Sequence, residues 1–204
     1  MNWMQKITKE VLEQALVGGE ISGDAGSLNF QEIRRIAQQQ VSKLLIITRG
    51  PSGSGKSHLA KELAEKYNVP IIFSSDDYFM QDGQYNFDAH KLGENHAKNQ
   101  HRTEEAMKNG QRVIIVDNTN TKFWEMKNYV QLAQLYGYSV DFKEPDWSSE
   151  LKTPEGKWNI DFLERMQSQP DREKTLSRDI LERTVKGYEY NPTVEDVLKS
   201  ERGK

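Results

Sequence analysis

Residues 44–67 read LLIITRGPSGSGKSHLAKELAEKY, and this stretch decides the fold. It begins with LLIIT, a run with β-branched residues that is apolar on both faces, as is typical of a buried parallel strand. Residues 50–57, GPSGSGKS, then satisfy the pattern G-x-x-x-x-G-K-S/T, and a helical segment follows at 56–67. A strand, a glycine-rich loop and a helix in this order predict a loop that binds phosphate.

The residues of this loop indicate how it would hold a nucleotide. Its glycines let backbone N–H groups converge on phosphate oxygens, and the start of the helix adds the positive end of its dipole. We expect Lys56 to reach the terminal phosphates and the Ser57 hydroxyl to ligate Mg²⁺. The alternative, a tight glycine turn with an exposed lysine, is disfavoured by the flanking strand and helix. No N-K-x-D stretch occurs, which disfavours a guanine-selective protein. The residues expected to bind ATP are Gly50, Ser52, Gly53, Ser54, Gly55, Lys56, Ser57 and His58.

The chain after this loop alternates short apolar runs with helical segments. Strands joined by long crossovers predict a parallel sheet with helices on both faces, an α/β architecture. The further apolar runs lie at 70–74, 112–117 and 138–142, and the further helical segments at 89–109, 122–136, 160–168 and 173–187.

Two helical patterns precede the first strand, at 5–17 and 29–42. A chain of 204 residues is about the size of one large domain. We therefore expect a helical N-terminal extension over residues 1–43 and a P-loop kinase domain over 44–204, in which the helices of about 145–187 form a lid.

The composition limits the classes of function. A hydrophobic fraction of 35% and a charged fraction of 29% are typical of a soluble protein. Because no apolar run is long enough to span a bilayer and the first residues do not resemble a signal peptide, we expect a cytoplasmic protein without membrane contact. The absence of cysteine excludes disulfides and thiolate chemistry. A net charge of −3 argues against coating nucleic acid through the overall field, but leaves room for a local basic groove.

Two adjacent carboxylates, Asp76 and Asp77, follow the 70–74 run. We expect this strand to neighbour the phosphate-loop strand, and ligands of open α/β sheets bind at the carboxyl ends of strands. A kinase needs a carboxylate that accepts the proton of the acceptor hydroxyl, and we assign this general base to Asp76. Asp77 should point differently and support the loop on the substrate side. Alternatively, the pair begins a turn before Tyr78.

The 112–117 run ends in VIIVDNTN. Asp117 lies where a carboxylate would hold Mg²⁺, directly or through water. Thr119 and Asn120 offer hydrogen-bonding groups for the substrate at the same edge. Alternatively, Asn120 or Thr121 caps the next helix, and the two roles are compatible.

The late helices carry mixed charge, which is typical of a solvated face. A kinase with a mobile lid nevertheless needs a cation over the transferring phosphoryl group. The candidates are Arg165, Arg172, Arg178 and Arg183. His90, His96 and His101 do not share one helix face, which disfavours a metal site there.

The chain resembles the P-loop polynucleotide kinase family, and within it the kinase-like domain of NEDD-four-binding protein two and its bacterial and phage relatives. The resemblance covers about residues 44–148 and continues more faintly to Tyr190. It implies ATP- and Mg²⁺-dependent phosphorylation of a 5′-hydroxyl, with the end of an RNA or DNA strand as the acceptor. The matching stretches are RGPSGSGKS, FSSDDYF, YNFDAHKLGENHAKNQHRTEEAM, VDNTNTKFWEMKNYVQLAQLYGY and KEPDW.

The resemblance also implies roles for single residues. Within FLERM, Arg165 matches the lid arginine of the family's L-x-x-R-N pattern, with Met166 in place of Asn. Lys56 and Ser57 match the phosphate-loop pair, Asp76 the general base, and Asp117 with Thr119 and Asn120 the third-strand motif.

One departure concerns the acceptor. Phage polynucleotide kinases place an arginine shortly after the carboxylate pair to hold the acceptor's phosphate, whereas this chain has Phe79. Phe79 and the mild acidity favour a kinase of a small metabolite, such as the sugar nucleotide of zeta-toxin-like proteins, while the DNTN and WEM stretches disfavour it. A third possibility is a nucleotide-binding interaction module without an acceptor, with the N-terminal helices as its docking place.

Overall fold

The structure is a computed structural model, and it describes residues 43–69, 71–169 and 175–203. These residues belong to a unit that runs from Lys43 to Lys204. The helices expected at 5–17 and 29–42 lie outside the described residues, as does Arg172.

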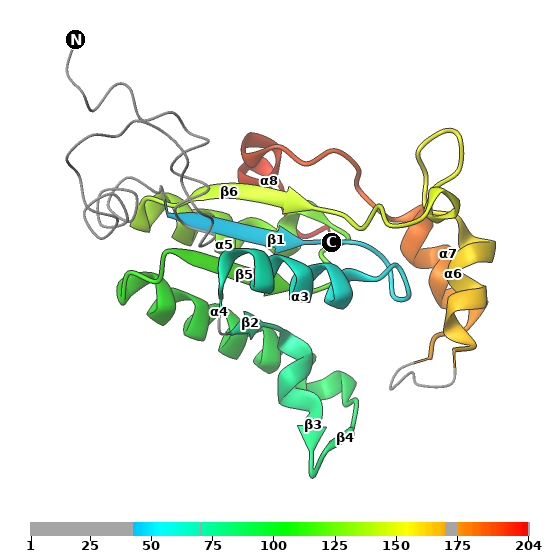
Figure 1. The fold of residues 1–204 in the computed structure, drawn as a ribbon, viewed down its shortest axis with the longest axis horizontal. Coiled ribbons are helices and arrows are strands. Elements are labelled where there is room, and N and C mark those ends of the chain that lie inside the picture. Colours follow the sequence, from blue (N-terminus) through cyan, green and yellow to red (C-terminus); the bar gives the residue numbers. More distant parts are fainter. Residues whose placement is uncertain (1–42, 70, 170–174, 204) are drawn as a thin grey trace, which may run out of the picture. The chain divides into compact units, whose positions relative to one another are not determined.

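A four-stranded parallel sheet forms the centre of the described fold (Figure 1). Its strand order is β2-β5-β1-β6, and each neighbouring pair is parallel. The parallel α/β architecture expected from the alternating runs is thus confirmed. The strands are β1 (Leu44–Thr48), β2 (Ile72–Phe73), β5 (Val113–Asp117) and β6 (Ser139–Lys143).

The expectation that the 70–74 strand neighbours the phosphate-loop strand is wrong, because β5 lies between β1 and β2. The register pairs Thr48 with Asp117 and Phe73 with Val116. Every residue of β5 is buried, which suits a strand with neighbours on both sides, whereas β2 is shorter than expected and forms an edge. The residue next to the end of the phosphate-loop strand is therefore Asp117, and the two adjacent carboxylates lie one strand further away.

Helices cover both faces of the sheet. Alternate residues of β1 and β5 point to opposite sides, so that Ile46 and Ile115 pack against α3 while Ile47 and Val116 pack against α5. In Figure 1, α3 lies in front of the strands and α5 behind them. The helices are α3 (Lys56–Tyr67), α4 (Leu92–Lys108), α5 (Phe123–Tyr136), α6 (Ile160–Gln167), α7 (Arg178–Lys186) and α8 (Val194–Lys199), with short 3-10 helices η2 (Ser75–Phe79), η3 (Ala89–Lys91) and η4 (Ser149–Leu151).

Two elements were not expected from the sequence. The C-terminal tail contains α8, whose Val197 is buried in the core that includes α5. A hairpin of β3 (Met80–Gln81) and β4 (Gln84–Tyr85) follows η2 and projects from the sheet (Figure 1). Its turn residues Asp82 and Gly83 both have positive φ, the backbone that an Asp-Gly turn favours between two antiparallel strands.

The late helices have a hydrophobic core of their own, separate from the two sheet cores. Trp158 and Leu163 are completely or almost completely buried in it, together with Leu181 from α7. Helix α7 begins at Arg178, later than the expected 173. Among the described residues, no helix has the length and apolar character needed to cross a membrane. The described residues of α6 and α7 thus pack as a distinct helical layer within the unit.

The buried position of β5 leads to the first prediction. Ile115 has 0% exposure, so Ile115→Ala should lower the free energy of unfolding by about 2–5 kcal/mol through lost burial and the cavity left behind. Leu135→Ala on α5 is the matched control, because this side chain is 71% exposed and its loss should change stability by less than about 0.5 kcal/mol. Urea unfolding measures both, and equal effects would contradict the central position of β5.

Candidate active site

The loop that joins β1 to α3 has the backbone conformation of a phosphate loop. Gly50, Gly53 and Gly55 have φ of 145°, 90° and 95°, a region that residues with a Cβ rarely adopt. A Cβ on Gly50 would lie 2.7 Å from Ser54 Oγ, so no side chain fits there. The Gly50 N–H donates to Thr119 O at 2.9 Å, which joins this loop to the loop after β5.

The side chain of Lys56 lies against the backbone of the phosphate loop. The Lys56 ammonium donates to Pro51 O at 3.0 Å, which holds it across the loop where phosphates would bind. Ser57 and His58 follow in the first turn of α3, and both are exposed. His58 Nε2 lies 3.5 Å from Glu62 Oε1 one turn further along. The loop thus presents backbone N–H groups, an ammonium and a hydroxyl at the start of one helix, a set of donors suited to a polyphosphate.

Oxygen ligands for a divalent cation are available beside the loop. The Asp117 carboxylate at the end of β5 accepts a hydrogen bond from Thr48 Oγ1 at 2.7 Å, and Ser57 offers its hydroxyl from α3. Within the described ranges, no three His, Asp or Glu side chains form a cluster that would hold a metal on their own. Mg²⁺ bound to a nucleotide takes few protein ligands and completes its shell with phosphate and water oxygens. The residues present therefore fit Mg²⁺ of this kind.

The two adjacent carboxylates have different surroundings. Asp76 is exposed and accepts a hydrogen bond from Tyr85 OH at 3.3 Å, whereas the Asp77 carboxylate pairs with the Arg102 guanidinium at 2.6 Å. Arg102 also donates to Ser74 O at 2.6 Å, so this α4 side chain clamps the start of η2. Asp77 thus joins η2 to α4, while Asp76 contacts the hairpin through Tyr85. The alternative that the pair begins a turn also holds, because Asp76 and Asp77 form the first turn of η2.

A buried polar network holds η2 against the end of β5. The Ser75 N–H donates to Asn118 Oδ1 at 3.0 Å. The Tyr129 hydroxyl accepts from Asn99 Nδ2 at 2.8 Å and from Asn118 Nδ2 at 3.4 Å, and Asn99 also donates to Phe73 O at 3.3 Å. Residues from β2, α4, α5 and the loop after β5 therefore fix the position of the segment that carries the exposed carboxylate.

This network was missed in the sequence, although α4 carries a signal. Asn95, Asn99 and Thr103 recur every four residues and are all buried, so they form a polar stripe on the inner face of the helix. Polar side chains on a buried face need partners, which marks the face as more than packing.

The loop after β5 is fixed by Asn120. This residue is buried and has a φ of 47°, and its side-chain amide donates to Thr48 O at 2.8 Å. Thr119 remains exposed at the edge of the site. The expectation that Asn120 or Thr121 caps the next helix is wrong, because the cap of α5 comes from Glu125, which accepts from Lys122 N–H at 2.8 Å. The amide of Asn120 thus shapes the substrate edge by holding two strand ends together.

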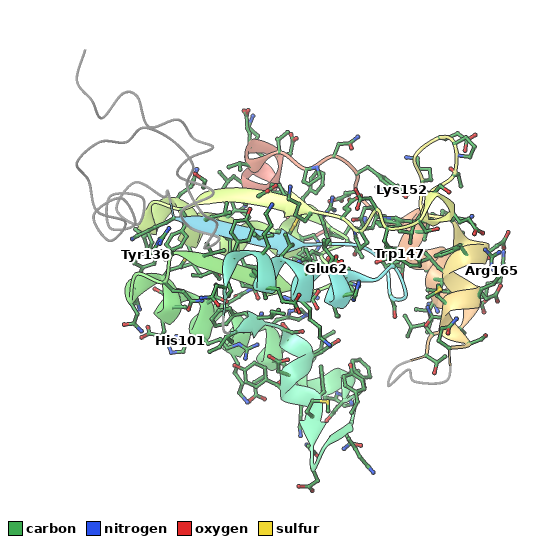
Figure 2. The ribbon with its side chains drawn as sticks, in the orientation of Figure 1. Glu62, His101, Tyr136, Trp147, Lys152 and Arg165 are labelled. Atoms are coloured by element: carbon green, nitrogen blue, oxygen red, sulfur yellow. The ribbon has the colours of Figure 1, made fainter. Side chains whose placement is uncertain are left out.

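Two side chains from the part of the chain after β6 contact the phosphate loop, one from a helix and one from a loop. Gln167 from α6 is buried and donates to Ser52 O at 3.1 Å. Trp147, in the loop after β6, donates from Nε1 to Ser54 O at 2.8 Å, and Figure 2 shows it beside the β1–α3 loop. Its signal in the sequence was its place in KEPDW, directly after a strand that neighbours β1.

The expected lid arginine is on α6 but pairs with a neighbouring carboxylate. Arg165 Nη2 lies 2.5 Å from Glu150 Oε2, and its side chain is exposed (Figure 2). Arg178 on α7 makes ion pairs with three carboxylates, Asp161, Glu164 and Glu182. The phosphate loop, Asp117 and Asp76 thus lie at or just beyond the carboxyl ends of β1, β5 and β2, at one edge of the sheet, while Arg165 lies on the surface of α6.

Comparison with known proteins agrees with this geometry. A family model described as an AAA domain matches residues 45–151, just over half of the chain. The chain is 45% identical over 124 residues to NEDD4-binding protein 2 of Homo sapiens. The matched region covers 61% of the chain and 7% of that protein. It is 28% identical over 153 residues to 2′,3′-cyclic-nucleotide 3′-phosphodiesterase of Rattus norvegicus, which covers 71% of the chain and 35% of that protein. The chain thus spans a minor part of either relative.

The contact between α4 and η2 gives a prediction about pH. His96 Nδ1 lies 3.0 Å from Ser75 Oγ, and burial lowers the pKa of His96 below its usual 6.5, although the carboxylates of Glu125 and Asp76 act in the opposite direction. Between the unfolded pKa and the lower folded pKa, the unfolded chain binds the proton and the folded chain does not. The free energy of unfolding should therefore fall as the pH falls through this window.

His96→Asn removes the titrating ring while keeping a hydrogen-bonding group near Ser75. Urea unfolding at about pH 7 and about pH 5.5 should show a larger loss of stability in the wild type than in this variant. The other histidines are common to both proteins and cancel in the difference. Equal losses in the two proteins would contradict the lowered pKa of the partly buried His96.

Proposed function

The chain belongs to the AAA-domain family of P-loop proteins, and from this premise we propose that it is an ATP-dependent phosphotransferase that moves the γ-phosphoryl group to an acceptor hydroxyl. The acceptor in this proposal is the 5′-hydroxyl of an RNA or DNA strand. The observation that carries the proposal is the meeting of the phosphate loop with an exposed carboxylate at one sheet edge.

The register supports this meeting. Because β1, β5 and β2 are parallel and pair Thr48 with Asp117 and Phe73 with Val116, their carboxyl ends lie level with one another. The loop, Asp117 and η2 all follow these ends directly. A phosphotransferase needs a polyphosphate cradle on one side and a proton acceptor on the other, with the reacting oxygen between them.

The residues would then have the following roles. The carboxylate of Asp76 accepts the proton of the acceptor hydroxyl. The oxygen of this hydroxyl bonds to the γ-phosphorus, and the bond between the γ-phosphorus and the bridging oxygen breaks, so that ADP leaves. Lys56 and the backbone N–H groups of the loop stabilise the charge that develops on the phosphate oxygens. Mg²⁺, held by Ser57 and Asp117, neutralises phosphate charge when bound. Arg165 adds a cation once the lid helix turns it towards the phosphates.

The acceptor side carries features that support a nucleic-acid strand. The cations next to the carboxylate pair are Lys98 and Arg102 from α4, which lie 5.8 and 5.0 Å from the ring centre of Tyr78. Lys98 also pairs with Glu94 and Arg102 with Asp77, so a strand would approach a mixed-charge surface that contains two cations. Phe79, in the place of the arginine of phage polynucleotide kinases, is buried against Tyr85 and Phe87 and leaves this role to α4. The name of the rat relative describes an enzyme that acts on nucleotides, which also favours an acceptor of this class.

Transfer of labelled phosphate tests the proposal. With γ-labelled ATP and Mg²⁺, the chain should label short 5′-hydroxyl RNA or DNA strands. Lys56→Ala and Asp76→Asn should each lower turnover by about two orders of magnitude or more, because one removes charge stabilisation and the other removes the proton acceptor. Strands that already carry a 5′-phosphate are the matched control and should take no label.

Two results would change the proposal. A near wild-type rate for Asp76→Asn would show that the base assignment is wrong. Absence of label on any strand, with ATP still bound, would exclude this acceptor class. It would leave two alternatives, a kinase of a small hydroxylated metabolite and a nucleotide-binding interaction module without an acceptor.

Salt dependence separates these two acceptor classes by binding alone. A strand that binds the protein through several of its phosphates releases the counterions of those phosphates. Its affinity should therefore fall steeply between about 50 and 200 mM salt. A small acceptor such as a sugar nucleotide carries few phosphates, so its affinity should depend much less on salt. Fluorescence anisotropy of a labelled 5′-hydroxyl strand, measured over this range with a single labelled nucleoside as the control, should show the steep fall for the strand alone. A flat profile for the strand would argue for the small metabolite.

The lid assignment has its own test. Arg165→Ala should lower turnover by about two orders of magnitude while leaving stability within about 0.5 kcal/mol of the wild type, because its pair with Glu150 is exposed and contributes little to folding. Arg178→Ala and Arg183→Ala, on α7, test the other arginines of the lid layer. Loss of turnover in one of these variants, with Arg165→Ala active, would move the role to α7.

A further inference from the structure

Trp147 lies against the phosphate loop and is not needed for any step of the proposed reaction. Its Nε1–H donates to Ser54 O at 2.8 Å, and a Cβ added to Gly55 would lie 2.4 Å from the same nitrogen. The chain reaches this point because β6 pairs with β1 and ends at the same edge as the loop. The indole therefore packs directly on the backbone at the start of α3.

The bond to Ser54 O shows on which side of the loop the indole lies. In a trans peptide the C=O of one residue and the N–H of the next point in opposite directions, and no cis peptide occurs among the described residues. In a phosphate loop the N–H groups point inward at the phosphates, so the Ser54 carbonyl points to the outer side. Trp147 thus sits on the outer rim of the cradle at the entrance to α3.

The rim is where the rest of a nucleotide has to go. When the loop and Lys56 hold the terminal phosphates, the ribose and base extend out of the cradle past the first turn of α3. A planar base beyond this turn needs an apolar surface, because its faces gain little from water and stack well on aromatic rings. The side chain at this rim is an indole, the largest aromatic surface that a protein offers.

The indole is both held in place and open to a ligand. Its nitrogen is bonded to the loop, and its ring packs on Phe162 of α6 with 5.6 Å between ring centres and an interplanar angle of 53°. Even so, Trp147 is 51% exposed, while Trp158 in the neighbouring cluster is 1% exposed. A ring that is already oriented loses little freedom when a ligand stacks on it.

We propose that Trp147 is the stacking platform for the base of the bound nucleoside triphosphate. This inference rests on the nucleotide site of the proposed function but not on the acceptor or on the transfer step. Since every base has a π-face, the platform recognises a nucleobase as a class and does not by itself select adenine. Phe162 supports the indole from behind and links the base to the helix that carries Arg165.

The test compares ATP with inorganic tripolyphosphate, which has the phosphates but no base. Calorimetry on the full chain with Mg²⁺ should show that Trp147→Ala binds ATP about ten-fold or more weakly than the wild type. The affinity for tripolyphosphate should change by less than about two-fold, because the loop that holds it is intact. Trp147→Phe keeps an aromatic ring without the N–H donor and should retain most of the ATP affinity.

Trp124→Ala is the matched control, since Trp124 is also partly exposed but lies on α5 beside Arg202, 5.0 Å from that guanidinium. It should bind both ligands as the wild type does. If Trp147→Ala does not fold, tryptophan fluorescence gives the same answer. ATP should quench the fluorescence of the wild type, and this quenching should be lost in Trp147→Phe.

Three results would overturn the proposal. Unchanged ATP affinity in Trp147→Ala would show that no base stacks there. Equal weakening of ATP and tripolyphosphate, or an effect in Trp147→Phe as large as in Trp147→Ala, would show that the indole shapes the loop through Ser54. Binding of neither ligand by the wild type would overturn the nucleotide site itself, whereas failure of phosphate transfer alone would leave this inference standing.

Discussion

The guanidinium of Arg49 is the constraint on which the rest of the site depends. This residue directly precedes the first glycine of the phosphate loop and has 0% exposure. A buried charge is strongly unfavourable unless it is paired and hydrogen-bonded, so its partners are fixed in place with it. Arg49 pairs with Glu144 at 3.2 Å, donates to Asn120 O at 3.1 and 3.2 Å and to Glu189 O at 2.6 Å, and stacks on the ring of Tyr188.

These partners come from segments that are far apart in the sequence. Glu144 follows β6, Asn120 follows β5, and Glu189 follows α7. Glu144 also accepts from the Tyr188 hydroxyl at 2.7 Å, and burial raises the pKa of that tyrosine well above its usual range. One buried cation thus joins the phosphate loop to the substrate edge and to the lid layer, and removing one partner would leave an unpaired charge at the base of the loop.

The sequence could predict the parts of the fold that depend on local pattern. LLIIT, GPSGSGKS and the helix after them carry strand, loop and helix signals within one short stretch, and the structure has them as expected. Strand order depends on contacts between distant segments, which is why β5 was not placed between β1 and β2. The same division holds for the candidate site. Loop residues follow from a motif, but Arg102 and Gln167 reach the site from helices whose inner faces no motif describes.

The two halves of the site are held by different means. The nucleotide side is fixed by glycine conformations, by Arg49 and by contacts from the lid layer, while the acceptor side is fixed by the buried amides and by the Arg102 clamp on η2. Asp76 and Asp77 are both exposed, and of the two it is Asp77 that pairs with Arg102. The proposed transfer between two substrates would need such an arrangement, because each substrate has to be positioned independently.

The proposed reaction requires that Asp76 faces the acceptor oxygen at the end of the phosphate chain. A crystal structure of the full chain with a non-hydrolysable ATP analogue, Mg²⁺ and a short 5′-hydroxyl strand tests this directly. The account predicts the 5′-oxygen within hydrogen-bond distance of the Asp76 carboxylate, about 2.6–3.2 Å, and in line with the γ-phosphorus. A 5′-oxygen held by another residue, or a strand bound away from this sheet edge, would contradict it.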